Sequence, residues 1–468
     1  MQVYLSVKNF GKIEEANINI SNFSVFVGNN NSGKSYMMQL IYGVMRHIRM
    51  EEEEMELVKD IAETLLDKKK LIIDEEKFEL LEMAVNQYLE RNKEKIVYEI
   101  FQSKIQIDKL EIHFELEEDI FQVRYLLLNE DNITNDLISN LMENEEIKKS
   151  EYEVDDTKKK AHFMQICNLK NVKKTMTLNV RFGEKLDKKN IVKAILNYIV
   201  MQQWGQSIYL PASRTGLMLL YRNYFADKAD KQVYSLSSED RQGENELGLT
   251  IPVYEFLRFL QTMKIDEKSV EKRQEIMRFI EEHIIDGHVD FSNPAHPYYS
   301  PQKSDAKVPL YLASSMVNEI APIFQVLMAK DLRRTIIWDE IETSLHPSKQ
   351  VEMARLLNRL NNAGYKLIVS THSDTMATKI NNLLMLSFED TTIEKQKAKL
   401  EKLNLSEEDL LHTDNVHVYQ FVNKENGKST VTELEFQTVP YVGYNFSQFN
   451  DNVMNLYEES KIIMGLDE

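Results

Sequence analysis

The sequence contains little cysteine, and it has no long apolar run. Cys167 is the single cysteine among 468 residues, which excludes an intramolecular disulfide framework and a thiolate zinc cluster. No stretch approaches the ~18 uncharged apolar residues that a transmembrane helix needs. The first residues, MQVYLSVKNFGKIEEA, lack the basic start and apolar run of a signal peptide. We therefore expect a cytoplasmic protein that does not enter a membrane.

Positive charge is also scarce, with 57 lysines and arginines against 75 acidic residues and a net charge of −18. This balance disfavours indiscriminate binding to DNA or to anionic membranes. One segment, 158–193, departs from it, and its basic residues are Lys158, Lys159, Lys160, Lys170, Lys173, Lys174, Arg181, Lys185, Lys188, Lys189 and Lys193. Such a run indicates either a nucleic-acid surface or a solvated face that opposes the acidic stretch before it.

A phosphate-binding motif lies near the N-terminus, where residues 28–35 read GNNNSGKS. The spacing matches G-x-x-x-x-G-K-[ST], in which backbone N–H groups cradle phosphates and the lysine neutralises them. An alternating strand-like run, FSVFVG, precedes the loop, and apolar residues at helical spacing follow it up to Ile48. This strand, loop and helix predict a nucleotide site formed by Gly28, Asn29, Asn30, Asn31, Ser32, Gly33, Lys34 and Ser35.

The rest of the chain indicates an α/β head interrupted by an insertion. We expect residues 1–50 to form the first part of the head, 51–205 an α+β insertion, 206–390 the second part, and 391–468 a segment of strands and a helix that contacts a partner or another copy. Within the insertion, alternation over 110–128 predicts a hairpin that turns at 117–119. Residues 235–248 have loop composition.

Two further apolar strands end in residues suited to nucleotide chemistry. Thr335 to Trp338 form a strand that delivers Asp339 and Glu340 at its carboxyl end. There Asp339 can hold Mg²⁺, and Glu340 can orient and deprotonate an attacking water. A later strand, YKLIVST, leads directly into His372, a position suited to sensing a γ-phosphate, with Ser373 capping the next helix.

In their order, the segments GNNNSGKS, YLASSMVNEIAP, IIWDEIETSLHP and IVSTHSD resemble the ABC-type ATPase head of the OLD/SMC branch, especially its stand-alone prokaryotic members. The resemblance covers 1–50 and about 205–390. It implies the fold class α/β: an ABC-type P-loop ATPase head with N-terminal antiparallel strands and an α+β insertion. It also implies ATP and Mg²⁺ as ligands.

The resemblance also assigns roles to individual residues. It implies that Lys34, Glu340 and His372 are catalytic and that Ser35 and Asp339 bind Mg²⁺. Ser314 and Ser315 fall where a signature serine contacts ATP on the opposite subunit, with Met316 in place of the usual glycine. Glu342 and the turn 344–347 match the segment that communicates across the dimer. Arg214, in LPASRTGL, either reaches the nucleotide or a partner chain, or is only salt-bridged.

The resemblance further implies a homodimer or higher oligomer that controls a separately encoded effector protein. Enzymes of the OLD class carry a TOPRIM nuclease with a D-x-D pair, but the 96 residues after His372 are too few for that domain and contain no such pair. Chains of this kind resemble ATPase components of bacterial antiphage systems such as PARIS and Septu. There the effector nuclease or toxin is a separate protein, and a phage protein is a candidate trigger.

Two other classes are alternatives. One is an SMC- or recombination-type ATPase in DNA repair that contacts nucleic acid through 158–193. The other, an ATPase subunit of a membrane transporter, is disfavoured by the N-terminal strands, the long insertion and the serine pair.

Overall fold

The computed structural model describes residues 2–20, 22–48, 51–116, 121–129, 160–168, 175–180, 188–203, 205–221, 248–293, 296–330, 333–388, 393–411, 416–439, 442–446 and 457–464. The chain divides into two compact units. Unit 1 comprises Met1–Lys8, Val44–Ile96 and Ile107–Gly205; unit 2 comprises Asn9–Gly43, Val97–Gln106 and Gln206–Glu468. The loop expected at 235–248 lies almost wholly outside the described residues, and so do most of the basic residues of the segment 158–193.

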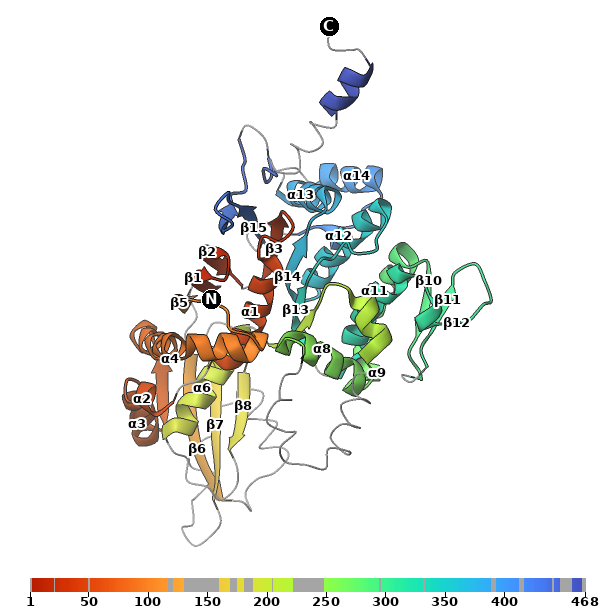
Figure 1. Cartoon of the computed structure of the whole chain (residues 1–468). Coiled ribbons are helices and arrows are strands. Elements are labelled where there is room, and N and C mark those ends of the chain that lie inside the picture. The colour runs from red at the N-terminus through yellow and green to blue at the C-terminus, as the bar shows by residue number, and fades with distance from the viewer. Residues whose placement is uncertain are drawn as a thin grey trace, which may run out of the picture. The chain divides into compact units, whose positions relative to one another are not determined.

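Unit 1 contains a four-stranded antiparallel sheet in the order β4-β6-β7-β8 and a separate antiparallel pair, β1 and β5. Helix α3 packs against β4, β6 and α6 (Figure 1). The elements are β1 (Gln2–Phe10), α2 (Glu52–Met55), α3 (Lys59–Lys68), β4 (Lys70–Ile73), α4 (Glu75–Phe101), β5 (Lys109–Glu115), β6 (Phe121–Asn129), β7 (Lys160–Asn168), β8 (Thr175–Val180) and α6 (Lys188–Gln203). Of these, β1 and α4 end in unit 2.

The expected hairpin over 110–128 is wrong. Both strands exist, but β5 pairs with β1, whereas β6 pairs with β4 and β7. The buried alternation of β5 explains its choice of partner, because Leu110, Ile112 and Phe114 lie directly opposite the equally buried Val7, Leu5 and Val3 of β1. Matched apolar faces set strand register more strongly than neighbourhood in sequence.

Unit 2 is built on a mixed sheet with the strand order β2-β16-β15-β3-β14-β13-β9. The strands are β2 (Ile13–Asn19), β3 (Phe23–Gly28), β9 (Gln206–Leu210), β13 (Arg333–Trp338), β14 (Lys366–Thr371), β15 (Val416–Asn423) and β16 (Ser429–Leu434). Neighbours from β15 to β9 run parallel. The sequence assigned β15 and β16 to a separate C-terminal segment, but both belong to this sheet. This α/β arrangement around a P-loop confirms the predicted fold class.

The helices of unit 2 cover this sheet, with α8 against β9 and α12 against both β14 and α13 (Figure 1). The helical elements are α1 (Lys34–His47, its last turn in unit 1), α8 (Ile251–Thr262), α9 (Glu267–Lys272), α10 (Gln274–Phe279), the π-helical turn η3 (Ile280–Ile284), η4 (Leu310–Leu312), α11 (Ser315–Met328), α12 (Pro347–Asn362), α13 (Asp374–Phe388), α14 (Ile393–Leu403) and η5 (Glu407–Asp409). A small antiparallel sheet joins β10 (Gly287–Asp290), β11 (Tyr298–Pro301) and β12 (Val308–Pro309).

The parallel strands decide where the site forms. Every residue of β3 is buried, and so are Ile336, Ile337 and Trp338 of β13. Strands covered on both faces read as continuous apolar runs, and their carboxyl ends meet at one edge of the sheet. At that edge β3 leads into the phosphate loop, β13 into Asp339 and β14 into His372. No helix among the described residues is long and apolar enough to cross a bilayer.

Candidate nucleotide site

The loop between β3 and α1 has a backbone that its residues are suited to adopt. Gly28 and Gly33 have φ values of +135° and +99°. A Cβ on Gly28 would lie 2.1 Å from the carbonyl oxygen of Phe421 in β15, so only glycine fits there. Asn31 also has a positive φ, +56°, which asparagine tolerates better than most residues. Helix α1 begins at Lys34, so the loop and the first turn present backbone N–H groups for an anion.

Lys34 lies almost completely buried within this loop. Its Nζ donates to the carbonyl oxygens of Gly28 (3.0 Å) and Asn29 (2.9 Å) and to Oγ of Ser32 (3.2 Å). Burial lowers the pKa of Lys34 to about 8, although the carboxylates of Asp339, Glu340 and Glu342 act in the opposite direction. A phosphate anion beside the ammonium group would restore the favourable environment that burial removes.

A cavity of about 870 Å³ opens at the loop and gathers residues from several segments of unit 2. Of the predicted site residues, Asn30, Asn31, Ser32, Gly33, Lys34, Ser35, Glu340 and His372 line it, together with Glu342. Gly28 and Asn29 do not line it and contribute through their carbonyl bonds to Lys34. Residues more than 330 positions apart thus share one cavity within unit 2, as the strand ends require.

The two carboxylates that follow β13 have different environments. Asp339 is buried, with Oδ1 accepting from Oγ of Ser370 (2.5 Å) and Oδ2 from the hydroxyl of Tyr209 (3.0 Å). Glu340 lines the cavity and has a φ of +45°. Its N–H donates to the same Ser370 hydroxyl (2.8 Å), which holds the turn. A non-glycine residue in this left-handed conformation is costly, and such strain concentrates at functional sites.

His372 faces the phosphate loop. Its Nδ1 lies 3.4 Å from Nζ of Lys34, and its backbone N–H donates to Oε1 of Glu342 (2.6 Å). Burial, and then the charge of Lys34, lowers the pKa of His372 below its ordinary value. The imidazole is therefore neutral near neutral pH and can donate one hydrogen bond and accept another.

A magnesium ion fits the donors available here. Ser35, which carries a hydroxyl, lines the cavity, and the nearby buried carboxylate of Asp339 retains lone pairs beyond its two hydrogen bonds. No group of three metal-ligating side chains occurs among the described residues. Mg²⁺ commonly takes only one or two protein oxygens and completes its shell with phosphates and water, so these few donors are enough.

Besides Gly28 and Asn29, four predicted site residues do not line the cavity: the buried Asp339, and Ser314, Ser315 and Arg214. Ser314 and Ser315 are exposed at the start of α11, where Oγ of Ser314 accepts from the N–H of Val317 (3.4 Å) and caps the helix. Arg214 is completely buried and forms an ion pair with Glu319 (2.9 Å). The structure therefore places Arg214 in a salt bridge, and it does not bring the guanidinium to the nucleotide cavity or to the surface.

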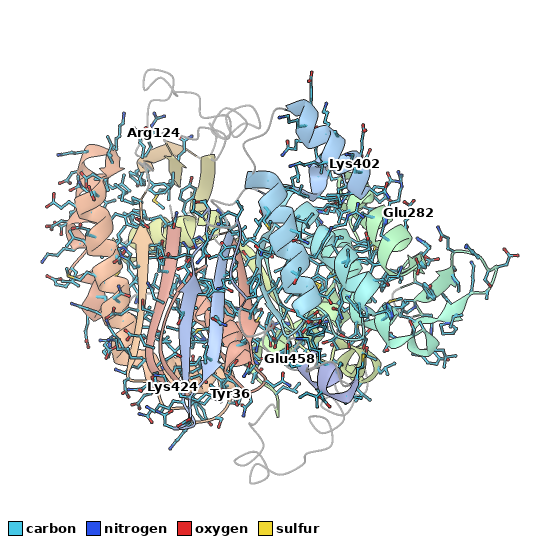
Figure 2. The ribbon with its side chains drawn as sticks, turned by 90° about the horizontal axis from the view of Figure 1, so that it is seen from above. Tyr36, Arg124, Glu282, Lys402, Lys424 and Glu458 are labelled. Carbon is cyan, nitrogen blue, oxygen red and sulfur yellow. The ribbon has the colours of Figure 1, made fainter. Side chains whose placement is uncertain are left out.

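Several lining residues escaped the sequence analysis. Lys12 contacts the carbonyl oxygen of Asn31 and Oδ1 of Asn423 (2.9 Å). Tyr36 is half exposed and stacks on Phe101, with ring centroids 5.4 Å apart and planes 13° apart. It lies at the end of the sheet where Lys424 follows β15 (Figure 2). The motif G-x-x-x-x-G-K-[ST] leaves the residue after Ser35 unspecified, so only the uncommon bulk of Tyr36 could have singled it out.

Residues 104–106 also line the cavity, and they follow the end of α4 with no motif that marks them. These residues reach the cavity only because α4 ends close to the phosphate loop. No local sequence pattern encodes that path.

Comparison with known proteins gives one family and a set of distant structures. A family described as AAA ATPase domain, AAA_15, matches residues 1–377. Solved structures similar to the chain include an SMC head bound to the C-winged helix domain of ScpA, with 13% identity, 92% of this chain and 97% of that chain covered, and a TM-score of 0.36. Another is an SMC head domain with an extended coiled coil bound to the C-terminal domain of ScpA, derived from Pyrococcus furiosus. It is 12% identical, the match covers 98% of this chain and 98% of that chain, and the TM-score is 0.34. A third is the SMC head domain from Thermotoga maritima, which is 10% identical. The match covers 93% of this chain and 100% of that chain, with a TM-score of 0.33. No curated protein matches the sequence.

Proposed function

Because the chain belongs to the AAA ATPase domain family AAA_15, we propose that it binds ATP with Mg²⁺ at the phosphate loop and hydrolyses it. One observation supports this most strongly: Lys34, Glu340 and His372 come from the ends of three parallel strands and line one cavity. A lysine for phosphate, a carboxylate for water and a histidine near the lysine are the parts that phosphoryl transfer needs.

The binding step uses the loop and the start of α1. Backbone N–H groups of residues 28–33 surround the β- and γ-phosphates, and Nζ of Lys34 exchanges its carbonyl partners for phosphate oxygens. Ser35 and Asp339 would hold Mg²⁺, and the ion would supply positive charge against the phosphate oxygens. The hydrogen bonds from Ser370 and Tyr209 fix the Asp339 carboxylate in place.

The chemical step uses Glu340 and His372. The carboxylate of Glu340 orients a water molecule and accepts its proton as the oxygen attacks the γ-phosphorus. The neutral ring of His372 donates a hydrogen bond to the γ-phosphate as charge builds up. Phosphate release by the purified full-length protein tests the activity: we expect release that requires Mg²⁺ and saturates with ATP. No release above that of a Lys34→Ala variant would reject it.

We further propose that the site is completed by a second copy of the chain. Ser314 and Ser315 are exposed at the N-terminus of α11 and lie outside the cavity of their own chain, where they are free to reach a nucleotide on another copy. Assembly would then depend on ATP. Native mass measured with ATP and without nucleotide distinguishes an ATP-linked dimer from a constitutive oligomer.

At the level of biology, we propose a sensor or regulatory ATPase in a bacterial antiphage system, which controls a separately encoded effector nuclease or toxin. The resemblance of the motifs to such ATPases supports this role. Plating of phages on cells that carry the gene with its neighbours, in wild-type and Lys34→Ala forms, tests it. Equal plating on both strains and on cells without the genes would contradict a defence role.

A DNA-repair ATPase of the SMC or recombination type is the alternative. Three of the basic residues of 158–193, Lys188, Lys189 and Lys193, are exposed on α6. Binding to a DNA duplex between about 50 mM and about 200 mM salt would fall steeply if such lysines neutralise phosphates. Alanine at these three positions should then flatten the slope, whereas binding that is absent at low salt removes this alternative.

A further inference from the structure

A buried arginine connects the catalytic turn with the helix that carries the serine pair. Arg214 follows β9, and its side chain is completely inaccessible to solvent. Its partner Glu319, on α11, is only 2% exposed. A buried ion pair contributes little net stability compared with well-packed apolar residues. Stability alone therefore does not explain why this ion pair lies in the core.

On one side, the guanidinium holds the turn that carries Glu340. Nη1 donates to the carbonyl oxygen of Asp339 (2.7 Å) and to that of Pro211 (2.8 Å). Nη2 donates to the carbonyl oxygen of Glu340 (3.2 Å). These bonds hold the carbonyls on both sides of the Glu340 Cα, whose φ of +45° is otherwise unfavourable. The direction of the Glu340 carboxylate thus depends on Arg214.

Arg214 and its neighbour Thr215 also bind helix α11, which carries the serine pair. Nε of Arg214 lies 2.9 Å from Oε2 of Glu319 and donates to its carbonyl oxygen (3.2 Å). The neighbouring Thr215 donates its N–H to Oε1 of Glu319 (2.9 Å) and its hydroxyl to the carbonyl oxygen of Ser315 (3.2 Å). Ser315 is the first residue of α11, and Ser314 caps it. Two adjacent residues therefore connect Glu340 to the serine pair through hydrogen bonds and one ion pair.

We propose that Arg214 and Thr215 are positioning residues that couple contact of the serine pair with a partner's nucleotide to the orientation of Glu340. This coupling presupposes the proposed ATPase and its completion by a second copy. When Ser314 binds phosphate oxygens on the partner, the start of α11 shifts with Ser315 and Glu319. Thr215 and Arg214 move with them, and the carbonyls of Asp339 and Glu340 follow. Each site would then hydrolyse ATP only when its own chain has also engaged the other site.

The mildest test removes a single bond. Thr215→Val keeps the shape of the side chain and deletes the hydroxyl that binds Ser315. We expect nucleotide affinity and melting temperature to stay at wild-type values, while kcat falls about tenfold because Glu340 is misplaced. Ser314→Ala should also lower kcat. If both residues act through one coupling, the double variant falls no further than Ser314→Ala alone. Losses that multiply in the double variant would overturn the coupling.

A second pair of variants separates positioning from folding. Arg214→Lys keeps the charge but loses the forked donors. Arg355→Lys changes another buried guanidinium, 8% exposed, that binds Asp409 outside the cavity. We expect only Arg214→Lys to lower kcat at unchanged nucleotide affinity. Equal effects of both variants would reduce Arg214 to a structural residue. Wild-type turnover in Ser314→Ala would reject the composite site itself, and the coupling would fall with it.

Discussion

Nζ of Lys34 lies 3.4 Å from Nδ1 of His372, although 338 positions separate the two residues in the chain. The contact exists because β3 and β14 are adjacent parallel strands that end at the same edge of the sheet. It places the ammonium group of Lys34 beside the neutral imidazole of His372 in the cavity at the loop. The pair therefore joins the phosphate loop to the end of β14 within the candidate site.

Replacement of Lys34 by alanine should abolish nucleotide binding. The ammonium group is buried among loop carbonyls, and phosphate oxygens have no other buried cation of this kind among the described lining residues. We expect the dissociation constant of a fluorescent ATP analogue to rise at least about 100-fold. Lys349→Ala, which removes an ion pair with Asp286 outside the cavity, is the matched control. Similar affinities for the two variants would contradict the assignment.

Nucleotide affinity should fall as the pH rises through about 8. The pKa of Lys34 is lowered to about 8 by burial, so the free protein loses this proton in a range where an exposed lysine stays charged. The nucleotide phosphates bind the protonated form of Lys34. Because one proton is linked to binding, affinity falls at most about tenfold per pH unit above the pKa. Lys34→Arg keeps its charge throughout and should show a flat profile from about pH 7 to about pH 9. Parallel profiles for both proteins would exclude Lys34 as the titrating group.

Replacement of Glu340 by glutamine should separate binding from turnover. The amide keeps the size of the side chain but cannot accept the proton of the attacking water, so hydrolysis should fall at least about 100-fold. ATP would then stay bound, and native mass spectrometry should show a stabilised dimer with ATP and not with ADP. Glu352→Gln, which alters a carboxylate paired with Arg355 outside the cavity, serves as control. Normal turnover in Glu340→Gln would refute its role as the base.

The sequence predicted the parts of the site that follow directly from strand ends. Gly28 to Ser35, Asp339, Glu340 and His372 each come just after an apolar run, and parallel strands bring such ends to one edge of the sheet. Local pattern and tertiary arrangement agree there, so the spacing of the sequence was enough to identify these residues. The structure places all of them at the edge where β3, β13 and β14 end.

The parts that sequence missed depend on distant partners. Nothing local shows that Lys12 meets Asn423, or that β15 lies beside β3 so that Phe421 touches Gly28. Alternation identified β5 and β6 as strands, but it could not assign β5 to β1. An arginine after a strand reads the same whether it is exposed or, like Arg214, buried against Glu319. Strand partners and burial emerge only from packing.

Gly28→Ala should damage folding as well as binding. Its φ of +135° is strained for any other residue, and the new Cβ would meet the backbone of β15 at 2.1 Å. We expect unfolding to become easier by about 3 kcal/mol or more. Gly364→Ala is the control: φ is +88° there, but no atom lies within 4 Å of the added Cβ, so only about 1 kcal/mol is expected. Equal shifts in urea midpoint would show that β15 yields to the added methyl group.

Tyr36 should contribute to nucleotide binding through the base or sugar and not through the phosphates. The ring is half exposed on the cavity and is held by its stacking on Phe101, so it offers a free face for a flat group. Stacking of a base on an aromatic ring contributes about 1–3 kcal/mol, and Tyr36→Ala should weaken ATP binding about tenfold at unchanged melting temperature. Tyr36→Phe should bind ATP like the wild type. Inorganic tripolyphosphate, which has no base, should compete with the fluorescent analogue equally well in the wild type and in Tyr36→Ala. A loss of tripolyphosphate affinity that matches the loss for ATP would show instead that Tyr36 supports the phosphate loop.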